Sequence, residues 1–187
     1  MKPKAEIALA LALGLSCTCG VSEVKATQGA APVVPACSDP FLPAEILNGP
    51  FVQAHDGVLP LITAEAPAAT LRLAVASDEP VRELGLMCVT RLRPQHGMIF
   101  VFPHNGPWEF WMKNTLIPLD MVWLDGRGVV TTVAERVPAA TRATPESALA
   151  RRRGVGRFVL ELPAGEAVRD GVKPGAELAL PPLQTSQ

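Results

Sequence analysis

The chain has 187 residues, which suits one domain with some additional sequence, because a single core usually serves about 100–200 residues. Hydrophobic residues make up 48% of it and charged residues 19%, a composition that excludes a highly charged, disordered chain. Seventeen basic and eighteen acidic residues give a net charge of −1, so the molecule as a whole does not attract phosphate backbones. We therefore expect no nucleic-acid partner.

The first 26 residues have the pattern of a signal peptide. Lys2 and Lys4 precede an apolar run from Ile7 to Leu15, which is too short to cross a bilayer as a mature helix. The small and apolar residues of Val24-Lys25-Ala26 suit signal peptidase, so we expect cleavage after Ala26. Residues 1–26 are thus predicted to direct export, and the expected location is the periplasm.

The cysteines leave two questions open. Cys17 could carry a lipid that anchors the protein to the envelope, which would be its one expected contact with a membrane. Cleavage after Ala26 would instead remove it and leave Cys37 and Cys88 in an oxidising compartment. These two either pair in a disulfide or remain apart, with Cys88 buried and reduced.

Residues 27–66 form an Ala- and Pro-rich spacer, because repeated prolines interrupt any helical or strand pattern. Leu59 to Thr63 is a candidate edge strand within this spacer. A single compact, strand-rich domain is predicted over residues 67–182, and residues 183–187 are a tail.

The first half of this domain contains two predicted strands and a helix. Thr70 to Val75 alternates in the period-2 manner of a half-buried strand. Ser77 or Asp78 can then cap a short helix. Met98 to Phe102 is a continuous apolar run, which predicts a buried strand ending in a turn at Pro103–Pro107.

The second half is predicted to return to the sheet. Leu119–Leu124 and Val129–Ala134 flank turn residues and indicate a hairpin, whereas 138–156 has the polar composition of a long surface excursion. Phe158–Leu162 is a further strand, and Ala164–Asp170 can form a helical turn. The expected fold is mainly β (α+β): a small antiparallel sheet or half-open barrel with one or two short helices.

Four motifs lie close together between Gly85 and Asp120. They are Gly85-Leu86-Met87, His96-Gly97-Met98-Ile99-Phe100-Val101-Phe102, Phe110-Trp111-Met112-Lys113-Asn114-Thr115 and Ile117-Pro118-Leu119-Asp120. In order and spacing they resemble the prokaryotic domain of unknown function 192 family, and the resemblance covers about Leu71 to Leu180. The family often has an aromatic residue and Arg after Gly-Leu-Met, where this chain has Cys88-Val89.

The resemblance implies a compact, mainly β domain that is often exported, and it supplies no agreed reaction or cofactor. We therefore expect no cofactor, and whether the protein is an enzyme stays open. From the residues themselves we select a candidate ligand site, in which indole rings would stack on a ligand and polar groups would orient it. Its members are Trp108, Trp111, Lys113, Asn114, Thr115 and Asp120. The alternative is that the polar members only shape and cap a turn.

The methionines suggest a second kind of site. Four of them fall in one short part of the sequence together with two histidines and a cysteine: Met87, Met98, Met112, Met121, His96, His104 and Cys88. Thioether and imidazole ligands suit Cu(I), although methionines also fill gaps in hydrophobic cores. No ligand set has the spacing of a dedicated metal loop, so no metal residues are assigned.

Three functions remain as hypotheses. The first is a periplasmic or envelope-associated binding module for a small molecule, glycan or protein partner. The second is a hydrolase or lyase of envelope material, which requires two titratable groups that converge on one pocket. The third is a copper-handling protein that uses Met and His ligands.

Overall fold

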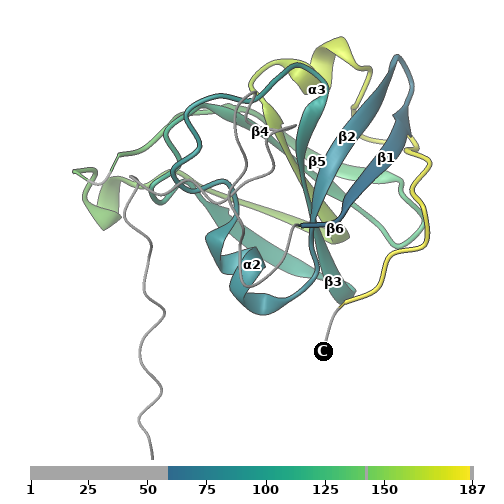
Figure 1. The fold of residues 1–187 in the computed structure, drawn as a ribbon, viewed down its shortest axis with the longest axis horizontal. Helices are drawn as coiled ribbons and strands as arrows, with labels where there is room; N and C mark the ends of the chain where they lie inside the picture. Colours follow the sequence, from purple (N-terminus) through teal and green to yellow (C-terminus); the bar gives the residue numbers. More distant parts are fainter. Residues whose placement is uncertain (1–58, 142, 186–187) are drawn as a thin grey trace, which may run out of the picture. The chain divides into compact units, whose positions relative to one another are not determined.

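The computed structural model describes residues 59–141 and 143–185 (Figure 1). The predicted signal peptide, Cys17, Cys37 and the spacer as far as residue 58 lie outside the described residues. The strands are β1 (Leu61–Ala66), β2 (Ala69–Ala76), β3 (His96–Trp111), β4 (Leu119–Leu124), β5 (Val130–Val137) and β6 (Arg151–Pro163). The helices are α2 (Glu79–Leu84), the 3-10 turn η1 (Glu146–Ala148) and α3 (Glu166–Arg169).

The strands form one six-stranded sheet in the order β1-β2-β3-β6-β4-β5. The predicted mainly β class with short helices is therefore confirmed. The sheet is mixed rather than purely antiparallel, because β2 and β3 run parallel while the other neighbouring pairs are antiparallel. Parallel neighbours need a crossover connection, which here contains α2. The six described strands do not close into a barrel.

The C-terminal segment links the two ends of this open sheet. Glu177 pairs with Val129, next to β5, and Ala179 pairs with Glu65 of β1. Two backbone hydrogen bonds join Ala179 and Glu65, and Leu178 donates another to the Gly128 carbonyl. One short stretch of chain thus contacts both outer strands.

Helix α2 begins as the sequence predicts. The Asp78 carboxylate accepts a hydrogen bond of 2.9 Å from the Val81 amide, and Pro80 lies in the first turn. This arrangement satisfies one of the amides that a helix N-terminus leaves free, and proline loses nothing there. The helix buries Val81 against the sheet.

Strand β3 continues beyond its predicted end. It runs through the expected turn at Pro103–Pro107 to Trp111, with a register shift between Val101 and Gly106. Its second half pairs with 151–156, which the sequence predicts as a surface excursion and which is instead the start of β6. Glycine makes this pairing possible, because a Cβ atom on Gly154 would lie 2.4 Å from the Trp123 ring.

The two faces of the sheet pack differently. One, here called the aliphatic face, buries Leu71, Leu73, Ile99, Val122, Leu160 and Leu162 and is covered by α3 and the C-terminal segment. The other, here called the mixed face, buries Met98, Phe100, Phe102, Met112, Met121 and Trp123 and is covered by α2 and the turn after it. Figure 1 shows α2 and α3 well apart on the sheet. Among the described residues, no helix has the length and apolar character needed to span a membrane.

Candidate functional site

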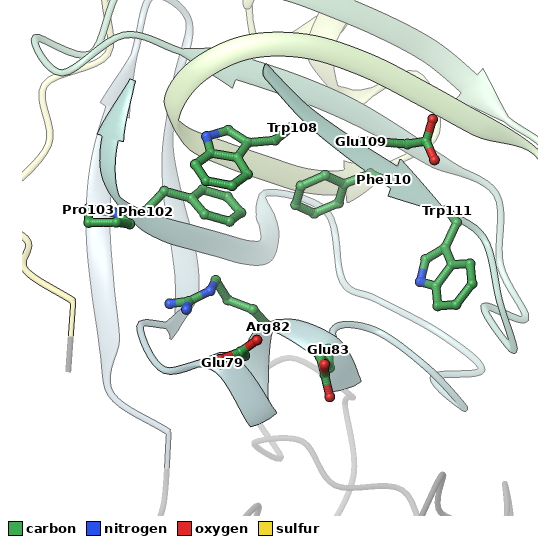
Figure 2. Close-up of a pocket in the computed structure, with 9 residues that line it drawn as sticks. All are labelled: Glu79, Arg82, Glu83, Phe102, Pro103, Trp108, Glu109, Phe110 and Trp111. Carbon is green, nitrogen blue, oxygen red and sulfur yellow. The ribbon is translucent and has the colours of Figure 1, made fainter. Parts of the chain in front are cut away.

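A groove of about 410 Å³ opens between α2 and β3 (Figure 2). Its volume lies within the range of about 300–1,000 Å³ that is usual for small-molecule sites. The residues that line it are Glu79, Arg82 and Glu83 from α2, and Phe102, Pro103, Trp108, Glu109, Phe110 and Trp111 from β3. The β3 wall is therefore largely aromatic, and the α2 wall is charged.

The aromatic wall is held in place by ring contacts. Phe102 and Trp108 stack with their centroids 4.0 Å apart and their planes 13° apart, and Phe110 meets Phe102 edge-on at 6.3 Å. The Trp108 indole N–H donates a hydrogen bond of 2.8 Å to the Gly156 carbonyl on β6. Such contacts fix ring orientations, so this wall is preorganised before any ligand enters.

Arg82 connects α2 to the strand. Its guanidinium lies 5.4 Å from the centre of the Phe102 ring and donates to the carbonyls of Ser77 and Val101, at 2.7 Å and 3.1 Å. These hydrogen bonds fix the position of the guanidinium group. Glu79 and Glu83, by contrast, are exposed and place two carboxylates at the mouth of the groove.

Two cations lie close to the Trp111 ring at the other end of the groove. The Lys113 ammonium is 4.8 Å and the Arg151 guanidinium 5.0 Å from its ring centre. Arg151 and Arg153 also pair with Glu109, and the hydrogen bond from Arg153 holds the pKa of the Glu109 carboxyl below its usual value. Cation–π contacts favour one orientation of the indole ring.

The remaining members of the sequence-derived site lie elsewhere. Asp120 is fully buried, and its carboxylate accepts hydrogen bonds from three backbone amides: Arg136 at 2.7 Å, Gly165 at 2.8 Å and Ala167 at 2.9 Å. These bonds tie β4 to β5 and to the start of α3. Asp120 therefore has a structural role, that of a backbone cap.

Asn114 and Thr115 form a buried turn after β3. Asn114 has a φ of 52°, and its carbonyl accepts a hydrogen bond from the Cys88 amide. The Thr115 hydroxyl donates to the Lys113 carbonyl at 3.3 Å. The structure thus brings Trp108 and Trp111 to the groove, sets Lys113 beside it, and orders Asn114 and Thr115 as a turn.

Phe102, Phe110 and Arg82 line the groove but were not predicted from the sequence. The two-residue spacing of Trp108 and Phe110 is a strand signal that could have placed both rings on one face. This signal was not used, because the strand was expected to end at the turn Pro103–Pro107, before Trp108. Arg82 gave no such signal, because its contact with Phe102 depends on where α2 crosses the sheet.

Glu161 is a second feature outside the selected site. The side chain lies inside the mixed face at 5% exposure, and burial raises its pKa to about 8, against an ordinary value of 4.5. One carboxyl oxygen accepts a hydrogen bond from the Leu86 amide, while Oε2 is buried without a partner. An unpaired polar atom in a core requires an explanation, because its desolvation is not compensated.

His96, His104 and Cys88 do not gather into a metal site. His96 Nδ1 lies 2.8 Å from the Pro94 carbonyl, and the His104 ring lies 5.7 Å from Trp108. Within the described ranges, no three side chains of the His, Cys, Asp or Glu type come together as metal ligands. Cys88 is buried and disulfide-bonded, and the other cysteines of the chain lie outside the described residues.

A pair of acids, Glu166 and Asp170, lies at α3 rather than at the groove. Glu166 is engaged on both oxygens, because it accepts from the Gln95 amide at 2.9 Å and pairs with Arg169. Burial, with the neighbouring Glu166 charge, raises the pKa of Asp170 to about 6. Neither acid lines the groove.

Comparison with known proteins supports one family. The model of the domain of unknown function 192 family, described as an uncharacterised group, matches residues 61–180. No match was found among curated proteins. A crystal structure from Sinorhizobium meliloti, described as that of a candidate transcription regulator, is 34% identical with a TM-score of 0.54 and covers 66% of this chain and 95% of its own. A protein of unknown function from Novosphingobium aromaticivorans is 26% identical with a TM-score of 0.52 and covers 74% and 97%.

Proposed function

The chain belongs to the domain of unknown function 192 family, and we propose that this member is an exported binding module that takes a glycan of the cell envelope into the groove between α2 and β3. Export rests on the predicted signal peptide at residues 1–26, and it places the module in the periplasm, soluble or anchored through Cys17. The aromatic wall of the groove is the observation that supports binding.

A glycan fits the chemistry of both walls. Sugar rings present flat faces covered by C–H groups, which pack on aromatic rings such as Phe110 and Trp111, and their hydroxyls donate hydrogen bonds to carboxylates. Glu79 and Glu83 offer such acceptors at the mouth. The same carboxylates disfavour an anionic ligand, since Arg82 is the one cation among the described residues that line the groove.

Two other functions have weaker support. An envelope hydrolase needs two acids that converge on one pocket, whereas Glu109 is held by two arginines and the pair Glu166–Asp170 lies at α3. Transcription regulation, the description of the Sinorhizobium protein, would need a basic surface for DNA. Here the net charge is −1, and Arg151 and Arg153 are paired with carboxylates.

Calorimetric titration of the purified exported protein tests the proposal. The probes are a tetramer and a hexamer of N-acetylglucosamine, which carry no charge. We expect saturable binding that weakens at least tenfold in Trp111→Ala, because the variant loses the ring on which a sugar would stack. A smaller loss is expected in Glu83→Gln, which keeps the shape of the side chain and removes its charge.

Val155→Ala is the matched control, since Val155 is exposed on the paired strand and does not line the groove. Its affinity should equal that of the parent protein. Affinity that is insensitive to Trp111→Ala, or no binding of either probe, would refute the glycan site. Mass spectrometry of the recovered probe separates binding from cleavage, because a shortened oligosaccharide would indicate the hydrolase instead.

A further inference from the structure

Three side chains form a row across the middle of the mixed face. Met98 on β3 and Met121 on β4 are both register partners of Glu161 on β6, which lies between them. Directly opposite residues on one face of a sheet have Cβ atoms about 4.5–5.5 Å apart. Both methionines are fully buried, so the carboxyl group of Glu161 is enclosed between two thioether side chains.

The row contains an unused ligand atom. Leu86 satisfies one carboxyl oxygen of Glu161, and Oε2 has no hydrogen-bond partner although it is buried. The neighbouring methionines cannot supply a proton to it, because a thioether has no donor. A carboxylate oxygen and two sulfur atoms are, however, all capable of binding a cation.

We propose that Glu161, Met98 and Met121 bind a single soft monovalent cation, which in the cell is Cu(I). Thioether ligands favour Cu(I) over the harder divalent ions. Methionine has three rotatable bonds, so each sulfur can turn towards the carboxylate without movement of the backbone. This site is separate from the groove and does not depend on what the groove binds.

Charge selects the valence of the ion. Two neutral thioethers, one carboxylate and one monovalent cation give a neutral cluster, which an apolar core can hold. A divalent ion would leave a net positive charge there. Within the described residues, no three His, Cys, Asp or Glu side chains come together as metal ligands, so a hard divalent ion finds no ready ligand set there.

Binding exchanges a proton for the metal ion. The carboxyl O–H bond of Glu161 breaks, the proton leaves to solvent, and an oxygen–metal bond forms with no change in oxidation state. Because a carboxylate binds a cation and a protonated carboxyl does not, the affinity should rise with pH. The turn that carries Leu86 donates the hydrogen bond that the Glu161 carboxyl accepts and packs on the same face.

Silver(I) is a suitable probe, because it has the softness and charge of Cu(I) but does not undergo redox cycling. The exported protein is first treated with iodoacetamide, which blocks free thiols and leaves the Cys88 disulfide intact. Native mass spectrometry should then show one bound Ag(I), and calorimetry should show at least tenfold weaker binding in Glu161→Gln, Met98→Leu and Met121→Leu. Met87→Leu is the control, since Met87 lies outside the row, and its affinity should be unchanged.

Proton release distinguishes ligation from a structural effect. In weakly buffered solution at pH 6.5, the parent protein should release about one proton per Ag(I) bound, and Glu161→Gln should release none. Circular dichroism checks that each variant is folded. Equal Ag(I) affinity in the parent and in folded Glu161→Gln, no bound Ag(I) in the parent, or an equal loss in Met87→Leu would each overturn the assignment.

Discussion

The two faces of the sheet are built from alternate residues of the same strands, yet they differ in chemistry. On β6, Leu160 and Leu162 point into the aliphatic face, whose apolar cluster consists of hydrocarbon side chains. Val159 and Glu161 alternate with them and point into the mixed face, which contains methionines, aromatic rings and an unpaired carboxyl oxygen. The aliphatic face supplies packing energy, and the mixed face holds both candidate sites at some cost in stability.

Replacing the ionisable side chain of Glu161 should produce the largest effect. The folded state keeps a proton on this carboxyl up to about pH 8, whereas the unfolded chain loses it near pH 4.5. Raising the pH through this window therefore favours the unfolded state, by up to about 5 kcal/mol. Glu161→Gln cannot ionise, so its free energy of unfolding should not decrease in this way between pH 4.5 and about pH 8.

Urea unfolding at pH 5 and pH 8 measures this difference, with a chelator present to remove metal ions. Glu177→Gln, at an exposed position, is the control and should follow the parent protein. An identical pH dependence in the parent and Glu161→Gln would show that Glu161 does not titrate as its burial implies.

The aliphatic face should be the less tolerant of changes in volume. Leu160→Ala removes buried methyl groups and leaves a cavity, for an expected loss of about 3 kcal/mol. Met121→Leu on the mixed face conserves volume, and its loss should stay below about 1.5 kcal/mol. Chemical denaturation of both variants tests the comparison, and losses of similar size would remove the distinction between the faces.

Asp120 should affect stability without affecting the groove. Asp120→Asn directs an amide group towards backbone donors that now meet a carboxylate, so we expect a loss of about 2 kcal/mol. Its glycan affinity should match that of the parent protein under conditions where both are folded. A weaker glycan affinity of Asp120→Asn, with unchanged stability, would show that Asp120 contributes to binding.

The smallest effect is expected from Lys113→Ala. The variant removes one of two cations beside Trp111, so the free energy of unfolding should change by less than about 1 kcal/mol. The looser indole should weaken glycan binding a few-fold. Lys173→Ala, at an exposed position outside the groove, provides the control for both measurements.

Local pattern was enough to predict most elements of the fold. The alternation of Thr70–Val75, the cap at Asp78 and the turn at Asp125–Gly128 depend on near neighbours, and β2, α2 and the β4–β5 hairpin follow them. The parallel pairing of β2 and β3 depends on a crossover, which no short window reveals. Pro103 and Pro107 suggested a turn because proline usually interrupts a strand. Sequence alone does not show that both lie at exposed positions within β3.

The candidate site was predicted only in part, because residue type does not show which partners a side chain has in the fold. Residue type shows that Asp120 and Thr115 can form hydrogen bonds, but it does not show that main-chain groups already occupy them. Trp108 and Trp111 were selected because an indole ring can stack on a ligand. Glu161 could have been predicted as a buried acid. It is the one charged residue in the apolar run Phe158–Leu162, and in a strand buried on both faces every side chain of such a run faces a core.

An open sheet exposes unpaired backbone groups along its outer strands, and such edges can pair with another molecule and seed aggregation. The pairing of Glu177 and Ala179 with residues next to β5 and in β1 protects part of both edges with a single segment. The last residues of the domain therefore have a protective role as well as a packing role. A chain that ends before Glu177 would retain all six strands and the groove, but it would leave both outer strands without this pairing and open to association with other chains.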